Sequence, residues 1–204
     1  MDPTQLVAKA MQYGAAQIPE EITAFVDFLK SRGPLHNVME IGSESGGTFF
    51  LWCRLTVLGG LKISVDLPSG TSGSGRFDNA KALAARTTLL KSWSANVHVV
   101  TGDSHEQKTW QEVNSILGPH APTLDLLFLD GDHSYEGVKA DWNDYRGFVR
   151  PGGLVAFHDI ADSHYHRRRG CEVARFWGEL RATRRNCREF SMRKEWGGIG
   201  CVTV

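Results

Sequence analysis

Residues 124–142 read LDLLFLDGDHSYEGVKADW, a strand pattern that ends on titratable side chains. The first six residues are almost all apolar, which is typical of a parallel strand that is covered on both faces. Asp130, Asp132 and His133 follow directly. In open α/β sheets the ligand lies in the crevice beyond the carboxyl ends of the strands. Two carboxylates and an imidazole in such a crevice need a partner, and a bound cation is one candidate.

The composition is that of an ordinary globular protein. The 204 residues are 41% hydrophobic and 23% charged, and Lys+Arg and Asp+Glu both total 23. A balanced charge gives no reason to expect nucleic acid or a membrane surface as a partner. We expect a single domain over residues 1–204, with residues 1–34 forming a helical segment before the first strand. The sequence leaves open whether the chain forms a homo-oligomer.

The spacing of the cysteines and the shortness of the apolar stretches favour a cytoplasmic protein. The four cysteines show no CxxC or zinc-ligand spacing, and no stretch approaches the length of a membrane span. We expect reduced, mostly buried thiols in a cytoplasmic protein; they are Cys53, Cys171, Cys187 and Cys201.

Arginines gather in the C-terminal half and allow two interpretations. Three are consecutive and four more follow; they are Arg167, Arg168, Arg169, Arg181, Arg184, Arg185 and Arg188. They form either a solvated helix face with its loop or a contact surface for an anionic or sugar-phosphate substrate.

Strand and helix patterns alternate along the chain. Strands are expected at 37–42, 62–68, 96–103, 124–130 and 154–159, with a closing antiparallel pair at 187–192 and 198–204. Helices are expected at 19–29, 46–60, 77–91, 104–117, 134–149 and 172–184, and a flexible loop at 69–75. This alternation predicts a doubly wound α/β fold, a mostly parallel seven-stranded sheet with an antiparallel C-terminal strand. Trp177 shares a helical spacing with Val173 and Leu180, which predicts a core position.

The loop after the first strand, EIGSESGG at residues 40–47, discriminates between cofactors. A dinucleotide fingerprint needs G-x-G-x-x-G. Gly42 and Gly47 fit its outer positions, but Glu44 occupies the middle one. A glutamate adds bulk and negative charge where a pyrophosphate would lie. The loop therefore favours a ligand that carries adenosine without phosphate.

Two further strand ends carry single acidic residues. Asp66 is placed to accept hydrogen bonds from two ribose hydroxyls, and Asp103 from an adenine amino group. The alternative for either residue alone is a helix cap or a turn. Their order along the chain favours the nucleoside site.

At this point the chain resembles the class I S-adenosylmethionine-dependent methyltransferases, which have a Rossmann-like fold. The motifs are VMEIGSESGG, SVDLP, VVTGDS and, most specifically, DGDHSYEGV followed by RPGG and FHD. The last set is similar to the group that includes the cephalosporin hydroxylase-like and macrolide-sugar O-methyltransferase families. The resemblance implies that S-adenosylmethionine is bound by Glu40, Gly42, Ser43, Gly46, Asp66, Asp103, Ser104 and Asp130.

Metal-dependent members of this fold, such as catechol O-methyltransferase, bind magnesium at the ends of strands four and five. Carried over by position, the ligands are Asp130, Asp159 and His158, with Asp132 in reserve. His158 departs from the pattern, because Mg²⁺ prefers oxygen ligands and imidazole suits transition metals better. Either His158 is not a ligand, or the metal differs, or no metal is used.

Two histidines are candidate catalytic residues. His133 lies three residues after Asp130, where catechol O-methyltransferase places its catalytic lysine, and an imidazole could take a hydroxyl proton. The alternative is a helix-start residue that hydrogen-bonds to backbone. His158 either binds the metal or orients the substrate. For His164 and His166 both solvent exposure and substrate contact stay open.

Together these patterns predict methyl transfer from S-adenosylmethionine to a hydroxyl of a small molecule, such as a sugar, with the help of a divalent cation. One alternative is a metal-free enzyme that uses His133 or His158 as its base. Another is a non-catalytic nucleoside-binding relative. An NAD-dependent oxidoreductase is disfavoured by Glu44.

Overall fold

The computed structural model describes residues 2–68, 80–118, 123–193 and 195–204. The helices in these ranges are α1 (Pro3–Gln12), α2 (Pro19–Ser31), α3 (Gly47–Leu55), α4 (Ala80–Ser92), α5 (Gln107–Leu117), α6 (Tyr135–Tyr145), the 3-10 turn η1 (Arg146–Phe148), α7 (His164–Arg168) and α8 (Val173–Thr183). The strands are β1 (Leu35–Ile41), β2 (Thr56–Asp66), β3 (Val97–Thr101), β4 (Leu124–Leu129), β5 (Val149–His158), β6 (Cys187–Phe190) and β7 (Ile199–Thr203).

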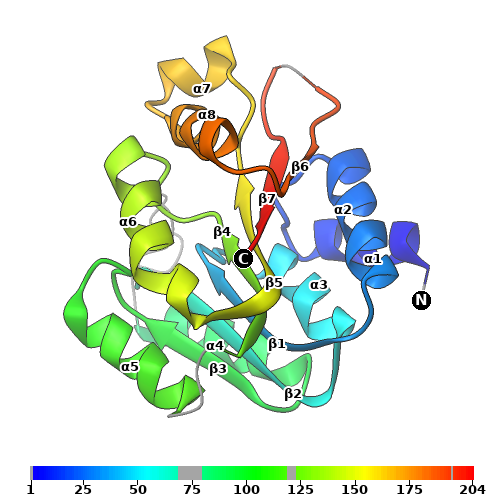
Figure 1. Ribbon diagram of the computed structural model, residues 1–204. Coiled ribbons are helices and arrows are strands. Elements are labelled where there is room, and N and C mark those ends of the chain that lie inside the picture. The colour runs from blue at the N-terminus through cyan, green and yellow to red at the C-terminus, as the bar shows by residue number, and fades with distance from the viewer. Residues whose placement is uncertain (1, 69–79, 119–122, 194) are drawn as a thin grey trace.

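The strands of the described residues form one seven-stranded sheet in the order β3-β2-β1-β4-β5-β7-β6 (Figure 1). Neighbouring strands from β3 to β5 are parallel, and β7 runs antiparallel to both β5 and β6. The predicted α/β sheet with an antiparallel closing pair is therefore confirmed. The strand order reverses at β1, whose neighbours are β2 and β4, and such a switch point opens a crevice beyond the carboxyl ends of the strands.

Helices cover both faces of the sheet (Figure 1). Apolar side chains of α1, α2 and α3 pack on one face, and those of α5, α6 and α8 pack on the other. Trp177 is only 2% exposed, so its predicted core position is confirmed. Strand β4 is buried along its whole length, as a central parallel strand should be, and it brings Asp130 to the crevice.

The predicted helix at 46–60 is wrong beyond Leu55. The chain leaves α3 there and enters β2 at Thr56, which pairs with Leu35 of β1. The β-branched Thr56 and Val57 suit a strand. A Cβ atom at Gly60 would lie 2.1 Å from the carbonyl oxygen of His36, so glycine permits the close approach of these two strands.

Two smaller differences concern β5 and the segment at 164–168. Strand β5 begins at Val149, five residues before the predicted start, and its pairing with β4 shifts register between Leu124 and Leu126. The arginine-rich segment at 164–168 is a short helix, α7, with Ser163 as its N-cap. The predicted flexible loop at 69–75 and the start of the helix at 77–79 lie outside the described residues.

All four cysteines are free thiols, and three of them are buried. Among the described residues we find no helix that has both the length and the apolar character to cross a bilayer.

Candidate active site

Two adjoining cavities open at the carboxyl ends of the strands. The first, of about 370 Å³, lies over the ends of β1, β2 and β3, and the second, of about 620 Å³, lies over the ends of β4 and β5. Gly42, His133 and Arg169 line both. A ligand that extends from one cavity to the other would therefore pass these three residues.

Gly42 is required by the local backbone. Its φ is +85°, and a Cβ atom there would lie 2.0 Å from the carbonyl oxygen of Asp130. The amide of Asp130 in turn donates to the carbonyl of Ile41 at 2.9 Å. The turn after β1 is thus pressed against the turn after β4, which only glycine allows. Glu44, two residues on, also has a positive φ of 41°.

Asp66 lies in the wall of the first cavity and is already engaged. Its Oδ2 is 3.1 Å from Nη2 of Arg86, and both side chains are buried. The same oxygen accepts from the amide of Glu44 at 2.5 Å, and Oδ1 accepts from the amide of Leu67 at 2.8 Å. Burial raises the pKa of Asp66, and Arg86 acts to lower it. Oδ1 keeps one lone pair for a ligand hydroxyl, since a carboxylate oxygen accepts two hydrogen bonds.

Asp103, Ser104 and His105 form the next part of that wall. Asp103 Oδ1 accepts from the amide of His105 at 2.9 Å, an Asx turn that matches the alternative anticipated for this aspartate. Asp141 of α6 lies beneath, 1% exposed, with its Oδ1 3.3 Å from His105 Nε2. A hydrogen bond to Asp141 raises the pKa of His105 to about 9. Sequence reasoning missed Asp141 and His105; the available signal was a carboxylate on the apolar face of a helix, next to Trp142 and three residues after Val138.

Two of the predicted cofactor residues line neither cavity. Glu40 is fully buried in β1, where burial and the negative charge of Asp130 raise the pKa of its carboxyl. Gly46 has a φ of +90°, and a Cβ atom there would lie 2.2 Å from the side chain of Leu90. Gly46 thus serves the packing of α3 against α4. Ser43 lines the second cavity, and its hydroxyl accepts from that of Ser64 at 2.8 Å.

Acidic and imidazole side chains meet where β4 and β5 end. Asp130 Oδ1 lies 3.1 Å from His158 Nδ1 and 3.2 Å from His133 Nε2. The pairing of β4 with β5 causes this meeting, because Leu129 is opposite Phe157 and the two chains leave the sheet side by side. Burial acts to lower the pKa of His158, but Asp130 and Asp159 raise it to about 9. His133 also has a raised pKa, since the nearby carboxylates outweigh burial.

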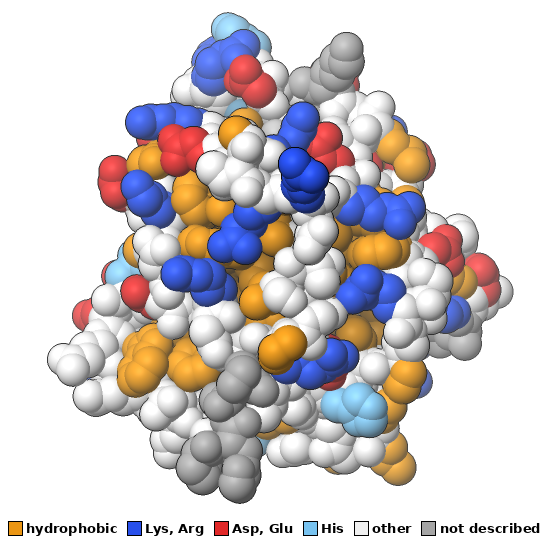
Figure 2. Space-filling view, in the orientation of Figure 1, with side chains coloured by type: hydrophobic (Ala, Val, Ile, Leu, Met, Phe, Trp, Pro, Cys, Tyr) orange, Lys and Arg blue, Asp and Glu red, His pale blue; other side chains and the backbone are white. Residues whose placement is uncertain are grey.

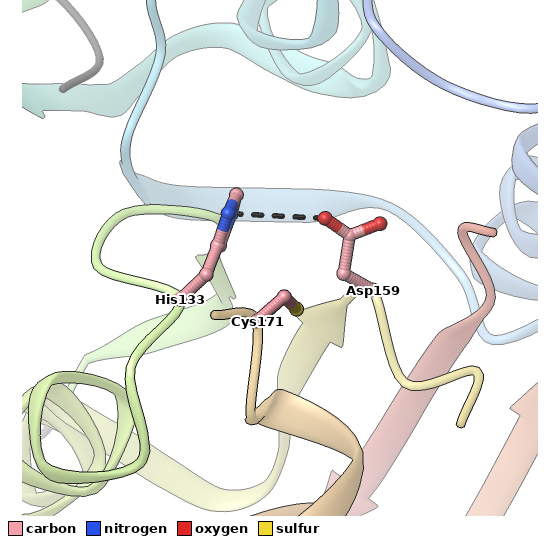
Figure 3. Close-up of side chains that lie close together, drawn as sticks. All are labelled: His133, Asp159 and Cys171. Atoms are coloured by element: carbon pink, nitrogen blue, oxygen red, sulfur yellow. Dashed lines mark ion pairs between the residues drawn. The ribbon is translucent and has the colours of Figure 1, made fainter. Parts of the chain in front are cut away.

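Asp159 completes this group (Figure 3). In that view its carboxylate faces the ring of His133, with the thiol of Cys171 beside them. Asp159 Oδ2 is 3.8 Å from His133 Nε2, and Oδ1 is 3.5 Å from His158 Nδ1. Burial acts to raise the pKa of Asp159, but His158 lowers it to about 2. Its φ of 61° is unusual for a residue with a side chain.

Ligand atoms of Asp130, His158 and Asp159 all lie within 4.8 Å of one another, a spacing that a metal ion could bridge. Atoms of His133, Asp159 and Cys171 meet the same condition. The reserve ligand Asp132 is not part of either group. Its Oδ1 accepts from the amide of Ser134 at 2.8 Å at the start of α6.

Three further side chains lie around this cluster; Gln17 and Cys171 were not anticipated there, and for His166 solvent exposure and substrate contact had both been left open. Gln17, between α1 and α2, donates to Asp130 Oδ2 at 3.0 Å. His166 of α7 is buried and its Nε2 is 3.2 Å from Asp159 Oδ1, so solvent exposure does not describe it. Cys171 lines the second cavity, and burial raises the pKa of its thiol to about 11. No local pattern pointed to them, because each arrives from a segment that the tertiary fold brings to the strand ends.

The arginines of the C-terminal half lie in two kinds of surroundings. Several pair with surface carboxylates: Arg167 with Asp162, Arg175 with Glu172 and Arg181 with Glu189. Figure 2 shows Lys and Arg side chains scattered among hydrophobic ones on one face, rather than gathered in a single patch. Arg169 differs from these, since it lines both cavities and its guanidinium lies 4.0 Å from the ring centroid of Tyr165.

Comparison with known proteins agrees with this geometry. Residues 39–160, more than half of the chain, match the family described as Methyltransferase domain. The match begins within β1 and ends just after Asp159, so it includes the ends of all five parallel strands.

Two curated relatives carry no assigned function. An uncharacterized protein of Sinorhizobium fredii is 27% identical over 150 residues, which are 72% of this chain and 15% of that protein. An uncharacterized protein of Acanthamoeba polyphaga mimivirus is 28% identical over 124 residues, which are 61% of this chain and 51% of that protein. The matched regions thus span 15% of the first relative's length and about half of the second's.

Solved structures share the fold. The O-methyltransferase of Bacillus cereus in complex with SAH superposes with a TM-score of 0.61 at 20% identity, over 100% of this chain and 91% of that chain. The O-methyltransferase TomG of Streptomyces achromogenes, solved with SAM, gives 0.62 at 17% identity, over 100% and 90%. The N-methyltransferase NodS of Bradyrhizobium japonicum gives 0.58 at 14% identity, over 88% and 92%.

Proposed function

The chain belongs to the methyltransferase-domain family, and from this premise we propose that it transfers the methyl group of S-adenosylmethionine to an oxygen atom of a small-molecule acceptor. One observation carries the proposal: two cavities of different chemistry adjoin at Gly42 and His133. The first offers acceptors for a nucleoside, and the second offers a base and carboxylates. Neither nucleic acid nor a membrane is expected as a partner, and oligomeric state and cytoplasmic location stay predictions.

The adenosine half of the cofactor fits the first cavity. Asp66 has acceptor capacity for ribose hydroxyls, and Asp103 and Ser104 lie further along the same wall. Glu44, with its negative charge beside Gly42, disfavours the pyrophosphate of NAD in this place. The bound S-adenosylmethionine of TomG and the SAH of the Bacillus cereus enzyme support the same cofactor for this fold.

The acceptor and the reacting atoms fit the second cavity. The acceptor oxygen attacks the methyl carbon, the bond from that carbon to sulfur breaks, and S-adenosylhomocysteine leaves with the sulfur electron pair. The hydroxyl proton passes to Nδ1 of His133, because Nε2 of the same ring donates its own proton to Asp130 Oδ1 at 3.2 Å; His133 lines both cavities. Holding oxygen and methyl group in line is itself a large part of such catalysis.

A divalent cation at Asp130, His158 and Asp159 fits the donor set, because ligand atoms of all three lie within 4.8 Å of one another. When bound, such an ion would lower the pKa of the acceptor hydroxyl and fix its oxygen. The alternative is a metal-free enzyme. In that alternative the hydrogen bonds of His133 and His158 to Asp130 hold both imidazoles in place without an ion.

Calorimetry tests the cofactor assignment. We expect S-adenosylhomocysteine to bind and NAD not to bind. Asp66→Asn should weaken binding by about 1–3 kcal/mol, because ribose donors are left poorly paired. Asp144→Asn, an exposed change on α6, is the matched control and should bind as the unchanged protein does. Tight NAD binding without S-adenosylhomocysteine binding would contradict the proposal.

A further inference from the structure

Resting on the proposed methyl transfer, we propose that the cluster at the ends of β4 and β5 binds a transition-metal dication of the zinc class rather than Mg²⁺. The protein ligands are Asp130 Oδ1, His158 Nδ1 and Asp159 Oδ1. The remaining positions face the second cavity and the acceptor.

The spacing of the three donor atoms fits a single ion. Ligand atoms that bind zinc at about 2.0–2.2 Å lie roughly 2.8–3.6 Å from one another when they are tetrahedral or adjacent octahedral neighbours. His158 Nδ1 is 3.1 Å from Asp130 Oδ1 and 3.5 Å from Asp159 Oδ1. One imidazole nitrogen therefore lies at ligand spacing from both carboxylates. Small movements of the three side chains would bring their donor atoms to coordination distance from one ion.

An unsatisfied buried oxygen points into the cluster. Asp159 Oδ1 accepts no hydrogen bond, although its residue is only 9% exposed. A buried carboxylate oxygen without a hydrogen bond is costly, and a cation beside it would offset that cost. The positive φ of Asp159 adds a second cost, of the kind that is kept at functional sites.

His166 explains why no neighbouring N–H satisfies this oxygen. The amide of Gly197 donates to His166 Nε2 at 3.2 Å, so this nitrogen is an acceptor. The proton is then on Nδ1, which donates to the carbonyl of Ala161 at 2.7 Å. His166 Nε2 therefore has no proton to give to Asp159 Oδ1, 3.2 Å away. In this arrangement the lone pairs of Asp159 Oδ1 stay available for an ion.

The donor types select the metal. Mg²⁺ takes oxygen ligands in near-ideal octahedra and keeps much of its water. An imidazole ligand instead suits Zn²⁺, Fe²⁺, Co²⁺ or Ni²⁺. His158 is 3% exposed, too deeply buried to turn away and let water replace its nitrogen. The thiol of Cys171, close to His133 and Asp159, is a further soft group in the wall. Three protein ligands with open positions are also the pattern of catalytic zinc sites.

Competitive binding to the metal-stripped full chain tests this assignment. Zn²⁺ or Co²⁺ should be retained at one ion per chain through equilibrium dialysis against excess Mg²⁺, as measured by elemental analysis. Bound Co²⁺ should also give visible absorption bands that report nitrogen ligation. Retention of Mg²⁺ in preference to Zn²⁺, or of no ion at all, would overturn the proposal.

Variants locate the ion. His158→Ala should weaken Co²⁺ binding by more than about 100-fold, because it removes one of the three ligands. His164→Ala, an exposed histidine on the same short helix as His166, should leave Co²⁺ binding unchanged. Co²⁺ binding that survives His158→Ala would refute the ligand set.

S-adenosylhomocysteine binding to each variant, measured by calorimetry, verifies the fold and separates the two proposals. If S-adenosylhomocysteine binds and Zn²⁺ does not, the metal assignment fails while the cofactor assignment stands. If neither binds, both fail.

Discussion

Arg86 of α4 and Asp66 at the end of β2 form a buried ion pair, with Nη2 and Oδ2 3.1 Å apart and side chains 3% and 6% exposed. The pair ties α4 to the strand end that forms the wall of the first cavity. Removing one partner leaves the other charge buried without compensation, and that loss is far larger than the net worth of the pair.

We therefore expect Arg86→Met to lower the free energy of unfolding by about 3–5 kcal/mol, as measured by urea denaturation. Adding Asp66→Asn should recover part of the loss, because the uncompensated charge is then gone. The matched control is Arg167→Met, which breaks the exposed pair with Asp162 and should cost less than about 1 kcal/mol. Additive losses in the double variant would show that the two charges do not compensate each other.

Gly42 gives a second test of the site's construction. Gly42→Ala places a Cβ atom 2.0 Å from the carbonyl oxygen of Asp130 in a backbone of φ +85°. We expect a loss of at least about 2 kcal/mol in unfolding free energy, from strain and backbone displacement together. S-adenosylhomocysteine binding should weaken as well, since the displaced loop lines both cavities.

Gly178→Ala is the control for Gly42→Ala. This glycine lies in α8, and a Cβ atom there meets nothing within 4 Å. The substitution should stabilise the protein by about 0.5–1 kcal/mol, because alanine is the better helix former. Equal effects of the two substitutions would mean that the contact between the turns after β1 and β4 is not restrictive.

Much of the fold could be predicted because its signals are local. The run 124–129 is apolar apart from Asp125, and Asp130 follows it. The strand, its direction in the sheet and the crevice at its end could therefore be predicted together. The error at 46–60 has the opposite cause. The apolar residues after Leu55 suit a helix and a strand equally, and the pairing of Thr56 with Leu35 decides between them.

Those residues of the candidate site that lie at strand ends could be predicted from the sequence. Asp130 and His158 belong to paired parallel strands, so their meeting follows from topology. Gln17 and His166 come from outside the sheet, and their contacts with Asp130 and Asp159 depend on how α1, α2 and α7 pack. The residues around such a side chain in the sequence give no pattern that would predict its place in the site.

The pair of His105 and Asp141 predicts a pH dependence of stability. Hydrogen bonding to Asp141 raises the pKa of His105 from its usual 6.5 to about 9 in the folded protein. The folded state therefore holds this proton more tightly than the unfolded state. The contribution is fully present below about pH 6.5 and is lost as pH rises through about 9.

Urea denaturation near pH 6.5 and near pH 9.5 should show a fall of about 1–3 kcal/mol in the protein, and a smaller fall in His105→Asn. The difference between the two proteins isolates this histidine from other groups that titrate in the same window. An identical fall in both would assign the pH dependence to those other groups.

His133 is the residue on which the proposed chemistry depends most directly. It lines both cavities, and its Nε2 lies 3.2 Å from Asp130 Oδ1, at the place where cofactor and acceptor would meet. As the proton acceptor, it contributes to the transition state and little to cofactor binding. His133→Ala should therefore lower kcat by about 10²–10⁴-fold, the usual worth of a positioned base. The KM for S-adenosylmethionine should change little.

Steady-state kinetics of His133→Ala, with His164→Ala as the exposed control, would separate two sources of catalysis. If a bound cation alone ionises the acceptor hydroxyl, the loss in His133→Ala should be well below the factor expected of a base. If His133 only closes the turn before α6, its removal should raise KM and lower stability while kcat is retained. A large fall in kcat with unchanged S-adenosylhomocysteine affinity is the result that assigns the proton to His133, because only a group that acts in the transition state gives that combination.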